Sequence, residues 1–194
     1  LKEKPLPRSP FTPKPYQTDA LTAIKTTLST QDRATVVMAC GTGKTLVSLW
    51  ATQDAQPKTV LVLVPSLTLL QQTLGEWSKH HTFAPGFRYL CVCSDQTVDL
   101  RNDELEVRPS DVEFRIDTNP EEVTRFLAHP TDDVKVIFST YQSSPVVGAG
   151  ATGYTFDLGI FDEAHKTTGR DGGAFGYALS DDRLRIKKRL FFTA

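Results

Sequence analysis

Six short runs of apolar, often β-branched residues recur along the chain and predict buried β-strands. Each run is continuously apolar, which is typical of strands that are covered on both faces. A sheet with one wet face would instead alternate apolar and polar residues, so we expect a mainly parallel sheet. The six runs lie at residues 34–39, 59–64, 87–93, 134–139 and 156–161 and from 190 onward.

Between these runs, apolar residues recur at steps of three and four, which is the period of an amphipathic helix. Ser66 can cap one of these helices, and Asn119 followed by Pro120 is typical of another helix start. Helices that alternate with parallel strands cover both faces of the sheet, so the pattern predicts a three-layer α/β domain. The helical apolar positions are Ala20, Leu21, Ile24 and Leu28; Leu46, Val47 and Trp50; and Leu67, Leu70, Leu74 and Trp77.

Length and composition fit one globular domain of 194 residues, of which 39% are hydrophobic. Residues 1–15 carry five prolines and predict an extended lead-in, which leaves 16–194 for the domain. No apolar run approaches the ~20 residues of a spanning helix, and no secretory signal opens the chain, so we expect no membrane association. The chain starts without Met and ends on an apolar strand, so we expect a fragment of a longer protein.

The cysteines and the charges add two expectations. Three cysteines at positions 40, 91 and 93 are too few for a disulfide framework, which favours reduced thiols and a cytoplasmic location. The stretch 95–133 holds twelve acidic residues and four arginines, a balance of −8, whereas the whole chain carries −1. The remainder is therefore +7, which is compatible with nucleic-acid binding. A solvated surface is the simplest interpretation of the acidic insert itself.

The strongest candidate site is the sequence Gly41-Thr42-Gly43-Lys44-Thr45, between a predicted strand and a predicted helix. Consecutive backbone N–H groups in such a loop, together with the helix N-terminus, bind phosphates. Lys44 can reach the β- and γ-phosphates, and the Thr45 hydroxyl can ligate Mg²⁺. Met38 replaces the first glycine of the strict pattern, so only the entry to the loop is expected to differ. The alternative is a helix-entry turn with an incidental lysine.

A second candidate site follows the fifth apolar run, where Asp162 and Glu163 stand side by side. Ligands of parallel α/β sheets bind outside the carboxyl ends of the strands, and these two acids lie at such an end. Asp162 suits Mg²⁺ and Glu163 suits the attacking water. The alternative is a pair of acids that caps the next helix. A phosphate loop requires a metal partner across the sheet, which favours the catalytic interpretation.

With these sites in place, the sequence resembles the first RecA-like motor domain of superfamily-two helicases and translocases. The similarity is to the branch that contains the motor subunits of type I and type III restriction enzymes, and it covers residues 15–194. Residues 38–45 are similar to motif I of the family, and Asp162-Glu163-Ala164-His165 is similar to motif II in its DEAH form. The resemblance implies a RecA-like P-loop NTPase fold and Mg²⁺-dependent ATP hydrolysis that drives movement on duplex DNA.

The resemblance also implies roles for individual residues. Pro15-Tyr16-Gln17 looks like the adenine-recognising segment of the family, in which the Gln17 amide offers a donor and an acceptor to the base. The implied nucleotide-binding residues are Gln17, Cys40, Gly41, Thr42, Gly43, Lys44, Thr45 and Leu46; the catalytic residues are Lys44, Asp162 and Glu163; and the metal ligands are Thr45 and Asp162. His165 and the opening of motif III, Thr193 and Ala194, would couple hydrolysis to movement.

Two segments after strand ends look like the family's DNA-contacting motifs. The implied DNA-binding residues are Pro65, Ser66, Thr140, Tyr141 and Gln142. Hydroxyls and helix N-termini at such positions can hold phosphates without reading bases. Ordinary helix capping and turn formation are the alternative. For the basic run 183–189, we expect a solvated helix face rather than a phosphate-binding patch.

The family binds ATP between two RecA-like domains, and the second domain supplies an arginine to the transition state. The chain stops at motif III, so the resemblance implies that this partner domain lies outside it. We therefore expect weak nucleotide binding and slow hydrolysis by the chain alone. Two other function classes remain open: a different P-loop NTPase, or an idle module that binds nucleic acid or protein. A GTPase would carry an Asn-Lys-x-Asp segment, and this sequence has none.

Overall fold

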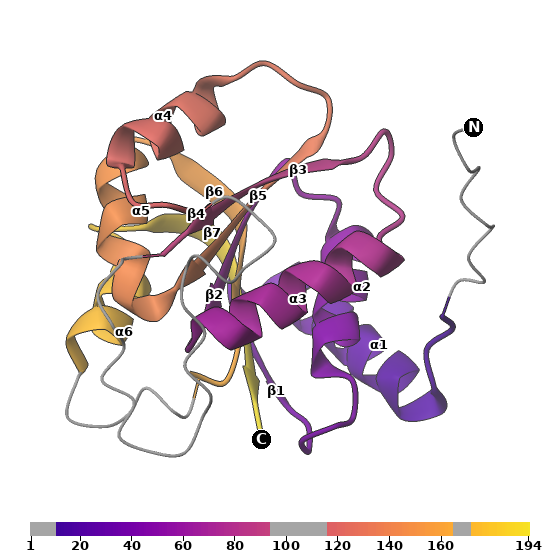
Figure 1. Cartoon of the computed structure of the whole chain (residues 1–194). Coiled ribbons are helices and arrows are strands. Elements are labelled where there is room, and N and C mark those ends of the chain that lie inside the picture. The colour runs from indigo at the N-terminus through magenta and orange to yellow at the C-terminus, as the bar shows by residue number, and fades with distance from the viewer. Residues whose placement is uncertain (1–10, 94–115, 165–171) are drawn as a thin grey trace, which may run out of the picture.

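A parallel sheet of seven strands forms the centre of the computed structural model, which describes residues 11–93, 116–164 and 172–194 (Figure 1). The strand order is β1-β7-β6-β2-β5-β3-β4, and every neighbouring pair is parallel. The mainly parallel sheet predicted from the apolar runs is thereby confirmed. The strands are β1 Arg33–Val37, β2 Thr59–Val64, β3 Phe87–Val92, β4 Ile116–Asp117, β5 Val134–Thr140, β6 Thr155–Phe161 and β7 Arg185–Thr193.

Helices cover both faces of the sheet, as the alternation of patterns predicts. Apolar residues of α1, α2 and α3 share one buried cluster with the strands, and those of α4, α5 and α6 share another. Figure 1 shows these two groups of helices on opposite sides of the sheet. The helices are α1 Pro15–Thr30, α2 Lys44–Ala55, α3 Leu67–His80, α4 Pro120–Ala128, α5 Ser144–Gly150 and α6 Gly172–Leu179, with a short 3₁₀ helix, η2, at Tyr141–Ser143.

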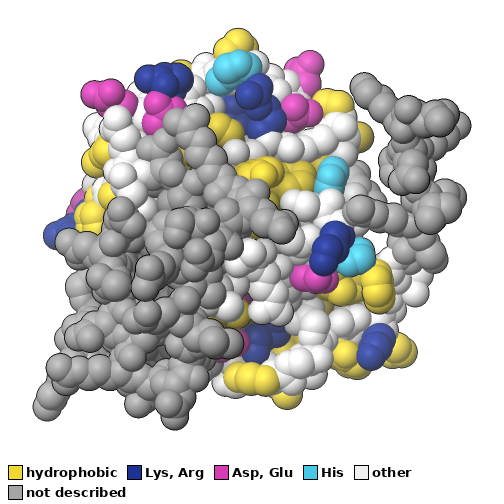
Figure 2. Space-filling view, viewed as in Figure 1, with side chains coloured by type: hydrophobic (Ala, Val, Ile, Leu, Met, Phe, Trp, Pro, Cys, Tyr) yellow, Lys and Arg dark blue, Asp and Glu magenta, His cyan; other side chains and the backbone are white. Residues whose placement is uncertain are grey.

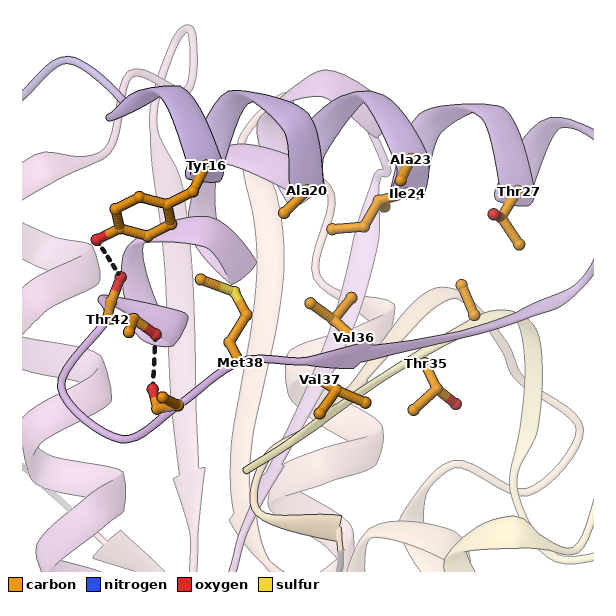
Figure 3. A pocket seen from close by; sticks show the side chains of 12 residues that line it. Tyr16, Ala20, Ala23, Ile24, Thr27, Thr35, Val36, Val37, Met38 and Thr42 are labelled. Carbon is orange, nitrogen blue, oxygen red and sulfur yellow. Dashed lines mark hydrogen bonds between the residues drawn. The ribbon is translucent and has the colours of Figure 1, made fainter.

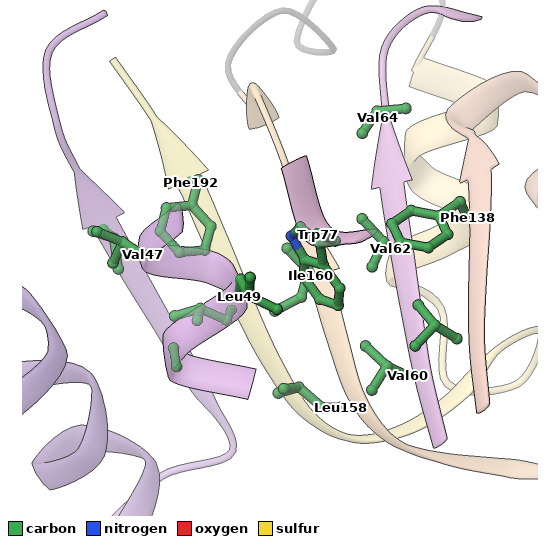
Figure 4. Close-up of a cluster of buried hydrophobic side chains, with 14 of the residues drawn as sticks. Val47, Leu49, Val60, Val62, Val64, Trp77, Phe138, Leu158, Ile160 and Phe192 are labelled. Atoms are coloured by element: carbon green, nitrogen blue, oxygen red, sulfur yellow. The ribbon is translucent and has the colours of Figure 1, made fainter. Parts of the chain in front are cut away.

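The strand β2 lies at the centre of the sheet, and all six of its residues are buried. Val60, Val62 and Val64 join the cluster under α2 and α3, while Leu61 and Leu63 join the cluster on the opposite face. Figure 4 shows the first cluster, in which the Trp77 ring from α3 packs edge-on against Phe138 from β5. A strand buried on both faces has no polar side, which explains the unbroken apolar run.

Several helix boundaries follow the sequence closely. The Ser66 hydroxyl accepts a hydrogen bond from the backbone N–H of Leu69, and the Asn119 side chain accepts one from that of Glu121. Both capping predictions are therefore confirmed. The first helix begins at Pro15, the last residue of the expected lead-in, so helix and lead-in overlap by one residue. Of the acidic insert, the residues from 116 onward form β4 and α4, and 94–115 lie outside the described residues.

The basic run near the C-terminus was expected to be a helix face, and that expectation is wrong. Residues 185–193 form the strand β7, which pairs with β1 on one side and β6 on the other. Arg189 is only 2% exposed; its guanidinium donates to the Ile186 and Leu184 carbonyls and to Asp181. Paired backbone on both sides outweighs local charge here, because buried backbone groups need hydrogen-bond partners.

Charged side chains on the face viewed in Figure 2 carry both signs and are interspersed. Over the part of the chain that the structure describes, every helix is too short or too polar to cross a bilayer.

Candidate nucleotide-binding and catalytic site

The loop between β1 and α2 has a backbone shape that its two glycines make possible. Gly41 and Gly43 have φ angles of 76° and 84°, in the left-handed region that side chains disfavour. Gly43 is also the N-cap of α2, so the loop leads directly into the positive end of the helix. A Cβ atom on Gly43 would lie 2.6 Å from the Nε2 atom of Gln17. Position 43 therefore requires glycine for conformation and for space.

Two side chains of α1 hold this loop in place. The Gln17 Nε2 group donates to the Thr42 carbonyl at 2.9 Å, and the Tyr16 hydroxyl donates to the same oxygen at 3.2 Å. The Gln17 Oε1 atom accepts from the backbone N–H of Lys14 at 2.9 Å. Gln17 is buried, and both the oxygen and the nitrogen of its amide have protein partners. The structure thus gives Gln17 a role in positioning the loop, and contact with adenine stays a prediction.

The two candidate loops meet at Lys44 and Glu163. The Lys44 Nζ atom lies 3.1 Å from Glu163 Oε1 and 3.3 Å from the Met38 carbonyl oxygen, to which it donates. Only 9% of the Lys44 side chain and 13% of the Glu163 side chain are exposed. The Coulomb attraction in an ion pair this sheltered from water is stronger than in a surface pair, because the local dielectric is lower, and the cost of desolvating both charges offsets part of it. The sequence predicted that the glycine loop and the acid pair are adjacent, and the structure places them so.

The acid pair follows β6 and is held by backbone contacts. The Asp162 N–H donates to the Leu63 carbonyl of β2 at 2.9 Å, and the Asp162 Oδ1 atom accepts from the Glu163 N–H at 3.0 Å. Glu163 has a φ angle of 50° and is one of two described non-glycine residues with positive φ. Such a conformation costs about 1–3 kcal/mol and persists where surrounding contacts impose it. Strained backbone of this kind is typical of functional sites.

The end of β7 lies between these two loops, because β7 separates β1 from β6 in the sheet. Thr193 pairs with Val37 in the strand register, and its carbonyl oxygen accepts from the Met38 N–H at 2.9 Å. Thr193 and Ala194 are therefore adjacent to the entry of the glycine loop, where a coupling segment is expected. His165 lies outside the described residues.

A cavity of about 440 Å³ opens beside the glycine loop, between α1 and β1 (Figure 3). Tyr16 and Met38 lie at its loop end, close to Thr42, and Thr27 lies at its far end. Most of the other lining side chains are small or aliphatic. The cavity offers a mainly apolar surface beside the loop, which suits the flat face of a heterocycle.

The oxygen donors present fit a hard divalent cation. Thr45 is the second residue of α2, after Lys44, and offers a hydroxyl, and Asp162 offers a carboxylate next to Glu163. Among the described residues, no three His, Cys, Asp or Glu side chains gather as a metal site. Mg²⁺ is commonly held by one or two protein oxygens together with phosphate and water. The donor set therefore fits Mg²⁺ bound with a phosphate ligand.

The predicted DNA-contacting residues separate into two groups. Gln142 is exposed, and Pro65 and Ser66 are partly exposed near the same edge of the sheet. Thr140 and Tyr141 are 3% and 2% exposed, so direct DNA contact by these two side chains is not supported. The Thr140 hydroxyl donates to the Ser143 hydroxyl, and the Tyr141 hydroxyl donates to the Asp162 carbonyl. Both hydroxyls lie inside the protein because the chain turns inward directly after β5.

The inward-pointing Tyr141 is the site residue that the sequence misassigned. Its hydroxyl lies 2.8 Å from the Asp162 oxygen, so it belongs to the surroundings of the acid pair. Burial, followed by the negative charges of Asp162 and Glu163, raises the pKa of Tyr141 well above its usual value. An aromatic residue after a buried apolar run was the available signal, but the sequence does not show which way the ring points.

A glycine loop at the start of α2 and an acid pair at the end of β6, on a parallel sheet in this order, define a RecA-like P-loop NTPase domain. The chain belongs to the family described as "Type III restriction enzyme, res subunit", which matches residues 10–194. Within that family it is a first RecA-like domain of the superfamily-two helicase type.

Curated relatives support this assignment. The probable helicase A859L of African swine fever virus is 33% identical over 184 residues in isolate Tick/Malawi/Lil 20-1/1983 and 32% identical over 184 residues in isolate Pig/Kenya/KEN-50/1950. Each match covers 92% of this chain and 19% of the viral protein. The chain therefore spans about a fifth of the length of these relatives.

Solved structures give the same architecture. The ATP-dependent Type ISP restriction-modification enzyme LlaBIII bound to DNA matches with a TM-score of 0.83 and 28% identity, over 100% of this chain and 13% of that one. A nuclease-deletion mutant of the Type ISP enzyme LlaGI, in complex with a DNA substrate mimic, matches with a TM-score of 0.75 and 29% identity, over 95% of this chain and 17% of that one. The Pyrococcus furiosus Hef helicase domain, at 20% identity and a TM-score of 0.58, shares the fold.

Proposed function

We propose that this chain binds Mg²⁺-ATP between the glycine loop and the acid pair and hydrolyses it to drive movement of a larger protein on duplex DNA. The observation that carries the proposal is the 3.1 Å pair of Lys44 Nζ and Glu163 Oε1 beside the loop. Phosphoryl transfer requires a cation for the phosphate oxygens and a group that orients the attacking water. Lys44 and Glu163 are those two groups.

The remaining site residues have complementary roles in the proposal. The backbone N–H groups of the glycine loop and of the first turn of α2 would hold the phosphates, with Cys40 and Leu46 at either end of that segment. Thr45 and Asp162 would hold Mg²⁺, which neutralises charge on the phosphates when bound. The cavity beside Tyr16 would take the adenine, and Gln17 remains the predicted adenine-contacting residue.

DNA and a second RecA-like domain are the proposed partners. The LlaBIII structure contains the enzyme bound to DNA and the LlaGI structure contains a complex with a DNA substrate mimic, and both enzymes are about as similar to this chain as its curated relatives are. The exposed Gln142 and the partly exposed Pro65 and Ser66 are the side chains here that could touch phosphates. We place the protein in the cytoplasm, since none of its three cysteines forms a disulfide.

The test is a comparison of three variants with the parent chain. Glu163→Gln should retain binding of Mg²⁺-ATP in calorimetry but lose hydrolysis by 10²-fold or more, since it removes the group that orients water. Lys44→Ala should weaken ATP binding itself, because the phosphate charge loses its partner. Glu76→Gln is the matched control, since Glu76 pairs on the surface of α3 with Lys79 and His80, and should change neither quantity.

Two outcomes would contradict the proposal. If calorimetric titration of the parent chain with ATP and Mg²⁺ gives no heat of binding even at high ligand concentration, the chain does not bind the nucleotide. Unchanged hydrolysis in Glu163→Gln would remove Glu163 from the reaction and would favour a different P-loop chemistry.

A further inference from the structure

The turn after β5 is joined to the acid pair by a single buried side chain. In the sheet, β2 lies between β5 and β6, so the segment that begins at Tyr141 is not a neighbour of the segment that begins at Asp162. The Tyr141 ring nevertheless extends past the end of β2, and its hydroxyl donates to the Asp162 carbonyl at 2.8 Å. Tyr141 is 2% exposed, so water does not compete freely for this contact.

The oxygen that Tyr141 holds controls the backbone of Glu163. The carbonyl of Asp162 belongs to the peptide unit that connects residues 162 and 163, and this unit turns as the φ angle of Glu163 changes. The Asp162 N–H is held by Leu63 at 2.9 Å, so the peptide units on both sides of Asp162 are held in place. The φ angle of Glu163 is 50°, a conformation that surrounding contacts must impose.

The same turn reaches the surface one residue further on. Gln142 is exposed. Thr140, two residues before it, and Ser143, directly after it, are buried, and the Thr140 hydroxyl donates to the Ser143 hydroxyl at 3.0 Å. A displacement of Gln142 would therefore be passed to its neighbours rather than absorbed by a loose loop. Tyr141 is the neighbour that contacts the acid pair.

We infer that Tyr141 is a positioning residue, which fixes the backbone of Glu163 through the Asp162 carbonyl and makes ATP hydrolysis sensitive to DNA at the turn Tyr141–Ser143. This inference rests on the proposed function. It reassigns Tyr141 from DNA contact to the link between the DNA-facing turn and the group that orients water.

The main test uses Tyr141→Phe, which keeps the ring and removes the hydroxyl. Single-turnover hydrolysis, with protein in excess over Mg²⁺-ATP, should slow on the order of tenfold because Glu163 is no longer held. The dissociation constant for Mg²⁺-ATP should stay within about twofold, because Lys44 and the glycine loop are untouched. Addition of a short duplex should stimulate hydrolysis less than it does in the parent. Tyr154→Phe is the matched control, because Tyr154 packs against Phe156 elsewhere in the fold.

A double variant separates positioning from a general structural effect. If Tyr141 acts through Glu163, Tyr141→Phe should cause little further loss of hydrolysis in a Glu163→Gln background. Additive losses would overturn the inference. Unchanged hydrolysis in Tyr141→Phe, together with the expected loss in Glu163→Gln, would also overturn it and leave the proposed function intact. Normal hydrolysis in Glu163→Gln would instead contradict the proposed function.

A measurement on the unmodified chain keeps the inference testable if Tyr141→Phe fails to fold. Hydrogen–deuterium exchange of the peptide that covers residues 161–164 should change when duplex DNA is bound, while exchange in the middle of α1 should not. Binding of the duplex, followed by fluorescence anisotropy, without any change at 161–164 would show that the turn and the acid pair are not linked.

Discussion

At the scale of single residues, the candidate site contains two backbone conformations with positive φ angles, one in each of its two loops. Gly43 takes a left-handed φ angle of 84° in the phosphate loop, and Glu163 takes one of 50° after β6. Glycine takes such angles at little cost, whereas glutamate needs external contacts. A glycine at position 43 was readable from the motif. The φ angle of Glu163 was not, because no local motif encodes it, and Leu63 and Tyr141, which hold the N–H and the carbonyl of the preceding Asp162, are distant in sequence.

Gly43→Ala should damage the site more than an ordinary glycine replacement. The left-handed angle costs about 1–2 kcal/mol for alanine, and the new Cβ would lie 2.6 Å from Gln17 Nε2. We expect the free energy of unfolding in urea to fall by about 1–3 kcal/mol. ATP binding should weaken at least tenfold, because the hydrogen bond from Gln17 to the Thr42 carbonyl must break.

Gly75→Ala supplies the matched control for this prediction. Gly75 lies within α3, and a Cβ there meets nothing within 4 Å. Alanine is favoured over glycine in a helix by roughly 0.5–1 kcal/mol, so this variant should be as stable as the parent or slightly more stable. Equal effects of the two replacements would show that position 43 has no special requirement.

At the scale of elements, one carboxylate connects three neighbouring strands, β2, β6 and β7, near the amino end of the sheet. Asp157 of β6 accepts hydrogen bonds from the backbone N–H groups of Lys58 and Thr59 and pairs with Lys187 of β7 at 2.7 Å. Burial alone would raise its pKa, but the hydrogen bonds and the lysine charge prevail, and the pKa of Asp157 is lowered. The contact gives Lys187 a partner on the strand β7, where the local charge pattern looked like a solvated helix.

Asp157→Asn should therefore destabilise the fold in a pH-dependent way. A lowered folded-state pKa means that the carboxylate stabilises the protein above its unfolded pKa, near 3.8, and that this contribution is lost as the pH falls below that value. We expect a deficit of about 1 kcal/mol at pH 7 in urea unfolding, which shrinks towards pH 3. Asp19→Asn is the control, because the Asp19 side chain is exposed, and it should leave the free energy of unfolding unchanged. A deficit that stays constant with pH would contradict the assignment to charge.

At the scale of the whole molecule, the strand order brings the chemistry together. The glycine loop follows β1 and the acid pair follows β6, and only β7 separates these strands in the sheet. The described chain offers Lys44 as the buried cation beside Glu163, and the proposed second domain would add an arginine from outside. An arginine supplied by a partner is worth ~10³–10⁵ in rate in related phosphoryl-transfer systems.

A protein that contains this chain together with the proposed second RecA-like domain should hydrolyse ATP ~10³-fold or more faster than the chain alone. Steady-state hydrolysis of the two, compared with and without duplex DNA, provides the measurement. The chain alone should unwind nothing in a strand-displacement assay. Rapid unwinding by these 194 residues alone would contradict the division of the motor into two halves.

The sequence by itself determined the parallel α/β class, the strand at 59–64 and the helix caps at Ser66 and Asn119, and it predicted the glycine loop and the acid pair as the site. These features depend on local periodicity, capping chemistry and short motifs, which neighbouring residues encode. Only the tertiary structure decided that the basic run is a strand, that Tyr141 points inward to Asp162 and that the Gln17 amide is bound to the Thr42 carbonyl. Each of these depends on which strands and helices become neighbours, and that choice is made by packing between residues far apart in the chain.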